Sequence, residues 1–335
     1  MKKIFIQYYR SFIPDNRKTV GDADWASFED MLRDCFQDLS YTFNKGICAL
    51  SKAINPDVIL SAHQTRLSDP KSHIFYKQMH LSNLFTIDTY GWGPQHSKMQ
   101  TAPDYLTIDP QKAIAFGKKL NTNFNARGSS KQSQPPLNSV RTTPEDFILA
   151  PIQRPTDVMI KNNSPISVYH FIRSLSDWAE ENKRNIVFKL HPGNYLDPEI
   201  IELAKKRSTG RKYVHLMEGN IHDLIEKSTG VVCINSGVGF EGLIHGKPVA
   251  TFGRCDYQWV TFNADVQFIE EAINYIDTYL VNQRIKAYQF IYYYYHHHAY
   301  SILEEEHEEN KKRLKSYLEL ALMKIVSETN LQDSN

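Results

Sequence analysis

Two short β-prone runs, each followed by a polar loop, constrain the fold of this chain more than any other feature. Residues 186–190 (Ile-Val-Phe-Lys-Leu) lead into 191–193 (His-Pro-Gly), and residues 230–234 lead into 235–239 (Asn-Ser-Gly-Val-Gly). Such runs predict strands that end in loops, and residues 240–249 continue as a short helix and another strand. A glycine turn that opens a helix at the carboxyl edge of a parallel sheet presents N–H groups and the positive helix end to an anion.

Each of these two signals is common on its own. A His-Pro pair after a strand is usually a loop without a ligand, and Gly-x-Gly after a strand recurs in many α/β folds. The second loop also lacks the third glycine of a dinucleotide fingerprint and the Gly-Lys-Ser/Thr ending of a P-loop. These two absences argue against a Rossmann dehydrogenase and against a nucleoside triphosphatase.

Composition sets the outer limits. The chain has 335 residues, 41% of them hydrophobic, which predicts a sizeable core and two domains. A formal net charge of +1 gives no sign of general affinity for nucleic acid. No apolar run approaches the roughly 20 residues that span a bilayer, and the opening residues lack a signal-peptide cleavage site, so we expect a cytoplasmic protein. The 4 cysteines are scattered and predict neither a disulfide framework nor a zinc site.

The strand and helix patterns divide the chain into three parts. Residues 1–143 open with a strand, continue with helices expected over 24–39 and 41–54, and end in a polar stretch that we interpret as the interdomain linker. Residues 144–264 alternate β-prone runs with amphipathic helices, which predicts a parallel sheet with helices on both faces. Residues 265–335 show a helical pattern and no strand signal. The expected fold class is α/β, with two Rossmann-like domains and a C-terminal helical segment.

Three motifs follow one another in the second part. They are Gln153-x-Pro155-x-Asp157, then residues 189–192 (Lys-Leu-His-Pro), then Asn235-Ser236-x-x-Gly239-x-Glu241 with residues 246–249 (Gly-Lys-Pro-Val). In this order they resemble the motifs of the capsule polysaccharide synthesis family, whose best-known members are retaining β-Kdo transferases. The resemblance covers about residues 149–260, and residues 87–91 can be laid on the family's acidic-residue-plus-glycine loop. It implies a GT-B architecture in which an HP motif and a serine motif hold a CMP-sugar.

The resemblance implies that the second domain binds the nucleotide. The residues expected there are Lys189, His191, Pro192, Asn235, Ser236, Gly237, Gly239 and Glu241. Cleavage of a CMP-sugar places charge on the leaving phosphate, and His191, the Ser236 hydroxyl and nearby N–H groups would stabilise that charge without a metal. Glu241 is expected to accept hydrogen bonds from ribose hydroxyls or the base amine. The alternative for Glu241 is an exposed, solvated helix carboxylate.

The same resemblance implies a covalent sugar intermediate on Asp157, because retention requires two inversions or a shielded ion pair. A helix cap is the alternative for Asp157. His191 is a second catalytic candidate, and Asp88 is a third, as general acid/base or acceptor-positioning group, with an Asx turn as its alternative. The residues expected at the donor or acceptor sugar are Gln153, Tyr90 and Trp92. The two aromatic rings would stack on a sugar face, and the alternative is that they are packed in their loop.

No Asp-x-Asp dipeptide indicates a divalent-ion site, and consecutive histidines such as 296–298 point in different directions on a helix, so we expect no metal and no cofactor besides the CMP-sugar donor. The expected reaction is metal-independent transfer of Kdo from CMP-Kdo, with retention, onto a bacterial surface polysaccharide or glycolipid. The alternatives are a different activated sugar donor, or a non-catalytic nucleotide- or sugar-binding component of a glycan assembly complex. The expected partners are the nucleotide-sugar donor and a glycan or glycolipid acceptor, with no nucleic acid. Peripheral contact with the inner membrane or with other glycan-assembly enzymes is compatible with this role.

Overall fold

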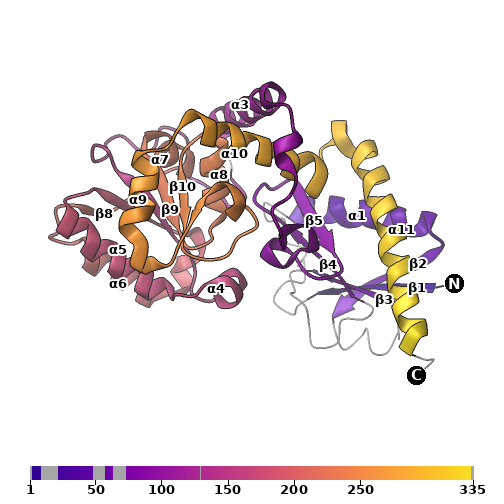
Figure 1. Cartoon of the computed structure of the whole chain (residues 1–335). Helices are drawn as coiled ribbons and strands as arrows, with labels where there is room; N and C mark the ends of the chain where they lie inside the picture. The colour runs from indigo at the N-terminus through magenta and orange to yellow at the C-terminus, as the bar shows by residue number, and fades with distance from the viewer. Residues whose placement is uncertain (1, 9–21, 48–56, 63–72, 129, 333–335) are drawn as a thin grey trace. The chain divides into compact units, whose positions relative to one another are not determined.

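The computed structural model describes residues 2–8, 22–47, 57–62, 73–128 and 130–332 (Figure 1). The chain forms two compact units, the first made of Met1–Pro103 with Tyr295–Asn335 and the second of Asp104–Tyr294. Each is an α/β unit built on a six-stranded sheet. The predicted fold class, GT-B-like with two Rossmann-like sheets and a C-terminal helix, is confirmed.

The first unit has the strand order β12-β5-β4-β3-β1-β2. Its strands are β1 (Lys2–Tyr8), β2 (Tyr41–Ile47), β3 (Val58–Ala62), β4 (His73–Gln78), β5 (Leu84–Asp88) and β12 (Tyr300–Ser301). The strands from β1 to β4 pair in parallel, whereas β5 and β12 are antiparallel to their neighbours. Helix α1 (Asp22–Asp38) lies against this sheet, with Phe28 stacked on Phe85 at 4.3 Å between ring centroids. Helix α11 (His307–Gln332) packs on α1, where Lys311 pairs with Asp34 at 3.0 Å.

The second unit has a fully parallel sheet of strand order β11-β10-β9-β6-β7-β8. Its strands are β6 (Ile148–Ile152), β7 (Ile186–Leu190), β8 (Val214–Leu216), β9 (Gly230–Cys233), β10 (Val249–Thr251) and β11 (Phe262–Asn263). Its helices are α3 (Pro110–Arg127), α4 (Val158–Asn163), α5 (Val168–Asn182), α6 (Pro198–Ser208), α7 (Ile221–Lys227), α8 (Gly237–Ile244), α9 (Ile269–Asp277) and α10 (Val281–Tyr293). Strand β6 lies between β7 and β9, so the loops that follow these three strands are neighbours at one edge.

Helices cover both faces of the second sheet, as the alternation predicted. One face packs in a shared core with α4, α5, α6 and α9. On the other face α8 approaches closely, since a Cβ at Gly242 would lie 3.0 Å from Val231 and 3.3 Å from Val249. Helix α5 has the expected buried stripe and begins at Ser167, whose hydroxyl accepts a hydrogen bond from the His170 N–H.

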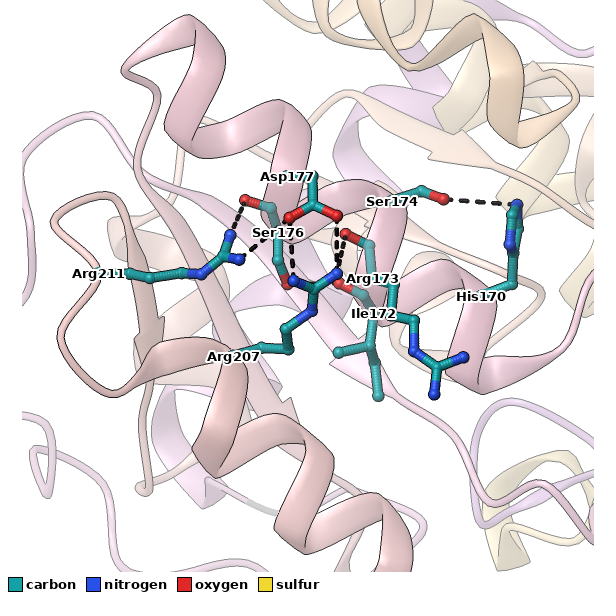
Figure 2. Close-up of polar contacts among 8 residues, drawn as sticks. All are labelled: His170, Ile172, Arg173, Ser174, Ser176, Asp177, Arg207 and Arg211. Carbon is teal, nitrogen blue, oxygen red and sulfur yellow. Dashed lines mark hydrogen bonds and ion pairs between the residues drawn. The ribbon is translucent and has the colours of Figure 1, made fainter.

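Charged side chains fasten α6 to α5 on the surface of the second unit (Figure 2). Arg207 binds Asp177 through two hydrogen bonds of 3.0 and 2.7 Å, and Arg211 adds a third at 3.0 Å. A second donor of Arg211 bonds the Ser176 carbonyl at 2.9 Å. Burial raises the pKa of the Asp177 carboxyl, but the hydrogen bonds from the two arginines outweigh this effect and lower the pKa. This network holds α6, which follows the His191 loop, in place.

The compact units divide the chain differently from the three expected parts. Helix α3 packs on α10 within the second unit, where a Cβ at Gly117 would meet the Tyr288 ring at 2.4 Å. The polar stretch that we interpreted as a linker is anchored there too, because the Asn220 amide donates to the carbonyl oxygens of Gly128 and Pro135 at 2.8 and 2.7 Å. Helices α9 and α10 also belong to this unit, and residues 295–335 belong to the first.

Two local predictions are wrong. Residues 41–47 form strand β2, since pairing with β1 overrides the helix expected over 41–54, whose remaining residues lie outside the described ranges. Tyr300 and Ser301 form β12 in a segment expected to lack strands. The strand forms because these residues pair with the edge of β5, and two residues are too few to show a strand pattern in the sequence.

Candidate active site

The loops after β6, β7 and β9 are joined at the carboxyl edge of the second sheet. Gln153 donates through Nε2 to Oδ1 of Asn235 at 2.9 Å, and the Asn235 N–H donates to Oε1 of Gln153 at 3.0 Å. Both side chains are buried. The His191 N–H donates to the Ile152 carbonyl at 3.1 Å, which extends the β6–β7 ladder to the histidine. Gln153 and Asn235 therefore hold the loops after β6 and β9 together.

His191 has a defined hydrogen-bonding state. It caps the 3-10 helix η5 (Pro192–Leu196), with its Nδ1 accepting from the Gly193 N–H at 2.9 Å. The Asn194 side chain accepts from the His191 N–H at 2.7 Å and completes a capping box. Burial lowers the pKa of His191, and nearby Asp157 offsets part of this effect. Because Nδ1 is an acceptor, this hydrogen-bond network assigns the proton of the neutral ring to Nε2, which is left as a donor.

Ser236 caps α8, the helix expected to face the phosphate. Its Oγ accepts from the Val238 N–H at 3.3 Å, so the hydroxyl proton remains available. The Tyr257 hydroxyl donates to the Ser236 carbonyl and holds this turn from the side. A Cβ at Gly239 would lie 2.5 Å from that hydroxyl, which explains the glycine by packing. In this first turn the Gly239 N–H donates to the Ser236 carbonyl at 2.9 Å, so the Gly237 N–H is the donor that the described structure leaves for an anion.

Glu241 is buried on α8, with 2% exposure, so its alternative as a solvated helix carboxylate is wrong. The Ser130 hydroxyl donates to Oε1, and Oε2 has no hydrogen-bond partner among the described residues. Burial raises the pKa of Glu241 to about 7, and the Ser130 hydrogen bond opposes that rise. This unpaired oxygen is itself buried, so it does not face an open surface of the described structure.

Asp157 lies on the loop after β6. Its Oδ1 accepts from the Met159 N–H at 2.8 Å, so the residue caps α4, while Oδ2 makes no hydrogen bond within the described structure. The cap therefore exists, and it leaves one carboxylate oxygen for chemistry. Lys189 is buried near this edge, where burial lowers its pKa and Glu218 partly restores it.

The first unit contains the remaining predicted residues. Asp88 is buried and accepts from the Tyr90 N–H at 3.0 Å, the Ser97 N–H at 2.9 Å, the Ser97 hydroxyl at 2.7 Å and the Tyr317 hydroxyl at 3.3 Å. This is the Asx-turn alternative. Trp92 is 1% exposed and its ring is covered by the Lys77 ammonium at 3.5 Å, so it is packed in its loop. Tyr90 is 42% exposed and presents its ring at the surface.

Sequence reasoning missed several residues of the second-unit site. The one with a readable signal is Asn194, three residues after His191, which is the spacing of a capping box. Ser130 lies well before the first motif and Tyr257 shortly after the last one, and neither carries such a signal. In the described ranges, no three His, Cys, Asp or Glu side chains gather in a way that would hold a metal ion. No helix in those ranges is long and apolar enough to cross a membrane.

Two α/β units, one with a fully parallel sheet and one with a largely parallel sheet, and polar loops at the carboxyl edge of the parallel sheet are typical of a GT-B-type protein. A family model described as "Capsule polysaccharide biosynthesis protein" matches residues 61–300. The chain belongs to this family, as the motif resemblance predicted.

Individual relatives are distant. The beta Kdo 2,4 transferase of Thermosulfurimonas dismutans KpsC superposes with a TM-score of 0.50 at 12% identity, over 85% of this chain and 89% of that one. The beta Kdo 2,7 transferase of the same protein gives 0.49 at 18% identity, over 86% and 90%. Protein FixF of Sinorhizobium fredii is 33% identical over 119 residues, which is 33% of this chain and 27% of FixF. The superposition at 0.50 supports a shared fold.

Proposed function

We propose that this chain is a glycosyltransferase that moves Kdo from CMP-Kdo, with retention, onto a bacterial surface polysaccharide or glycolipid. Membership of the capsule polysaccharide biosynthesis family supports a role in building such a glycan. The observation that carries the donor assignment is the pair of hydrogen-bond sources at one sheet edge, the His191 Nε2–H after β7 and the capped N-terminus of α8 after β9, on either side of the β6 loop. Together they suit a phosphate that gains charge as it leaves.

In this proposal the nucleotide lies along α8. The phosphate accepts from His191, the Ser236 hydroxyl and the Gly237 N–H at the start of α8. The ribose or the base donates to Glu241, whose Oε1 already accepts from Ser130, and this contact requires the buried Oε2 to become accessible when the nucleotide binds. Lys189 supplies further positive charge from β7.

Asp157 is the nucleophile in the proposed reaction. Its Oδ2 bonds to the anomeric carbon as the bond from that carbon to the phosphate oxygen breaks, and CMP keeps the electron pair. The acceptor hydroxyl then attacks the same carbon and releases the Asp157 carboxylate. The hydroxyl proton passes to the phosphate of bound CMP. Two inversions give net retention. Asp88 and Tyr90 remain proposals for the acceptor side.

A ligand panel tests the donor class. Thermal-shift measurements with CMP, UMP, GDP and phosphoribosyl pyrophosphate should show selective stabilisation by CMP, because a ligand that binds only the folded state raises the melting temperature. Selective stabilisation by another nucleotide would move the protein to a different activated sugar. Binding of CMP without hydrolysis or transfer of CMP-Kdo would favour a non-catalytic component of a glycan assembly complex.

A further inference from the structure

Arg154 is a fixed cation in the site that the reaction proposed above does not use. Its Nε donates to Oδ2 of Asp197 at 2.8 Å, and the Arg154 side chain is 29% exposed. Neither Nη group makes a hydrogen bond with another described residue. The ion pair therefore holds the guanidinium from the side and leaves its two-nitrogen end open.

The Arg154 stem is packed beside the predicted phosphate ligand His191. A Cβ at Gly193 would lie 2.9 Å from Cδ of Arg154 and 3.1 Å from Nδ1 of His191. The glycine thus lets the arginine stem cross the imidazole loop at close range. The Arg154 stem and the His191 ring therefore both lie against Gly193, with a planar fork at the end of one side chain and a single Nε2–H donor on the other.

Arg154 is one of four charged side chains near His191. Burial is the main cause that lowers the pKa of His191, nearby Asp157 and Asp197 oppose it, and Arg154 and Lys189 add to it. His191 and the α8 N-terminus already suffice for the single phosphate of a nucleoside monophosphate. The end-on fork of Arg154 matches a carboxylate, which it binds with two parallel hydrogen bonds.

We propose that Arg154 binds the carboxylate of an acidic donor sugar and thereby selects 2-keto acid sugars over neutral ones. In a nucleotide-activated sugar of this class, the carboxylate and the phosphate oxygen are bonded to the same anomeric carbon. The donor therefore carries two anions close together, and the two side chains that meet at Gly193 offer one donor group for each anion. This inference rests on the proposed function and specifies which part of the donor decides its selection.

The test compares CMP with CMP-Kdo on the full chain. Arg154→Gln should raise the Kd and KM for CMP-Kdo about 10- to 100-fold, because a pair of charged hydrogen bonds to the sugar is lost. The same variant should change the Kd for CMP, which has no carboxylate, by less than about threefold. Arg154→Lys should recover only part of the loss, because an ammonium restores the charge without the fork. Arg173→Gln, at an exposed arginine on α5, is the matched control and should leave both affinities unchanged.

The outcomes separate the two ideas. Equal weakening of CMP and CMP-Kdo in Arg154→Gln would make Arg154 a phosphate ligand and overturn the inference, as would unchanged affinity for both. If the wild-type chain turns over CMP-Kdo and either of these results is found, the inference alone fails. If the wild-type chain neither binds CMP-Kdo more tightly than CMP nor turns it over, the proposed function fails and the inference with it. Melting curves of each variant report whether it is folded.

Discussion

Replacing Glu241 by glutamine should change how stability depends on pH. Glu241 is 2% exposed, and burial raises its pKa from 4.5 to about 7. Below pH 4.5 the carboxyl is protonated in both the folded and the unfolded chain, and it costs nothing. Between pH 4.5 and 7 the unfolded chain loses this proton while the folded chain keeps it, so the free energy of unfolding falls as pH rises. Above pH 7 the whole cost is present.

The size of the effect follows from the two pKa values of Glu241, 4.5 and about 7. At about 1.4 kcal/mol for each tenfold change, this rise corresponds to about 3 kcal/mol. Glutamine keeps the shape and does not titrate, so the stability of Glu241→Gln relative to wild type should rise by about 2 to 3 kcal/mol between pH 5 and pH 8. In a unit the size of Asp104–Tyr294, this is roughly 4 to 12 °C in melting temperature.

Scanning fluorimetry of both proteins across pH 5 to 8 measures this difference. Any loss of packing in the variant lowers its melting temperature equally at every pH. The diagnostic quantity is therefore how the difference in melting temperature between the variant and wild type changes with pH. Glu202→Gln, at an exposed carboxylate on α6, is the matched control and should follow wild type at every pH. Parallel curves for Glu241→Gln and wild type would refute a buried carboxyl with a raised pKa.

Substitutions at three further positions test the site. His191→Asn keeps a capping side chain but loses the Nε2–H donor, so calorimetry should show CMP binding weakened by about 1.5–3 kcal/mol with little change in melting temperature, and unchanged affinity would remove His191 from the phosphate site. Gly239→Ala places a Cβ 2.5 Å from the Tyr257 hydroxyl and should cost about 1–3 kcal/mol of stability, which an unaltered melting curve would contradict. Asp157→Asn should abolish transfer but keep the α4 cap and the affinity for CMP. Asp157→Ala should in addition lower the free energy of unfolding by about 1 kcal/mol, because the cap is lost. If Asp157→Asn turns over at the wild-type rate, Asp157 is a helix cap only.

The edge of the second sheet was predictable because strand ends are local. The runs that end at His191 and Asn235 predict both the strands and the loops, and parallel pairing of both strands with β6 then brings these loops to the same edge. The contact between Gln153 and Asn235 follows from that adjacency, although its reciprocal hydrogen bonds do not.

The environment of Glu241 was not predictable, because it depends on a residue far away in sequence. Ser130 reaches this carboxylate only because Asn220 holds the preceding turn at Gly128, and the composition of that polar stretch resembles a flexible linker. Strand β2 shows the same limit, since its state is decided by pairing with β1. The position of the Arg154 side chain likewise depends on its ion pair with Asp197, 43 positions later, and on the absence of a side chain at Gly193.

The most direct test of the account is the anomeric configuration of the product, measured by NMR. Wild-type protein is incubated with CMP-Kdo and a glycan acceptor, and the configuration of the transferred sugar is compared with that of the donor. The account predicts the same configuration in donor and product, because Asp157 inverts the anomeric carbon once and the acceptor inverts it again. A product of inverted configuration would contradict the double displacement at Asp157.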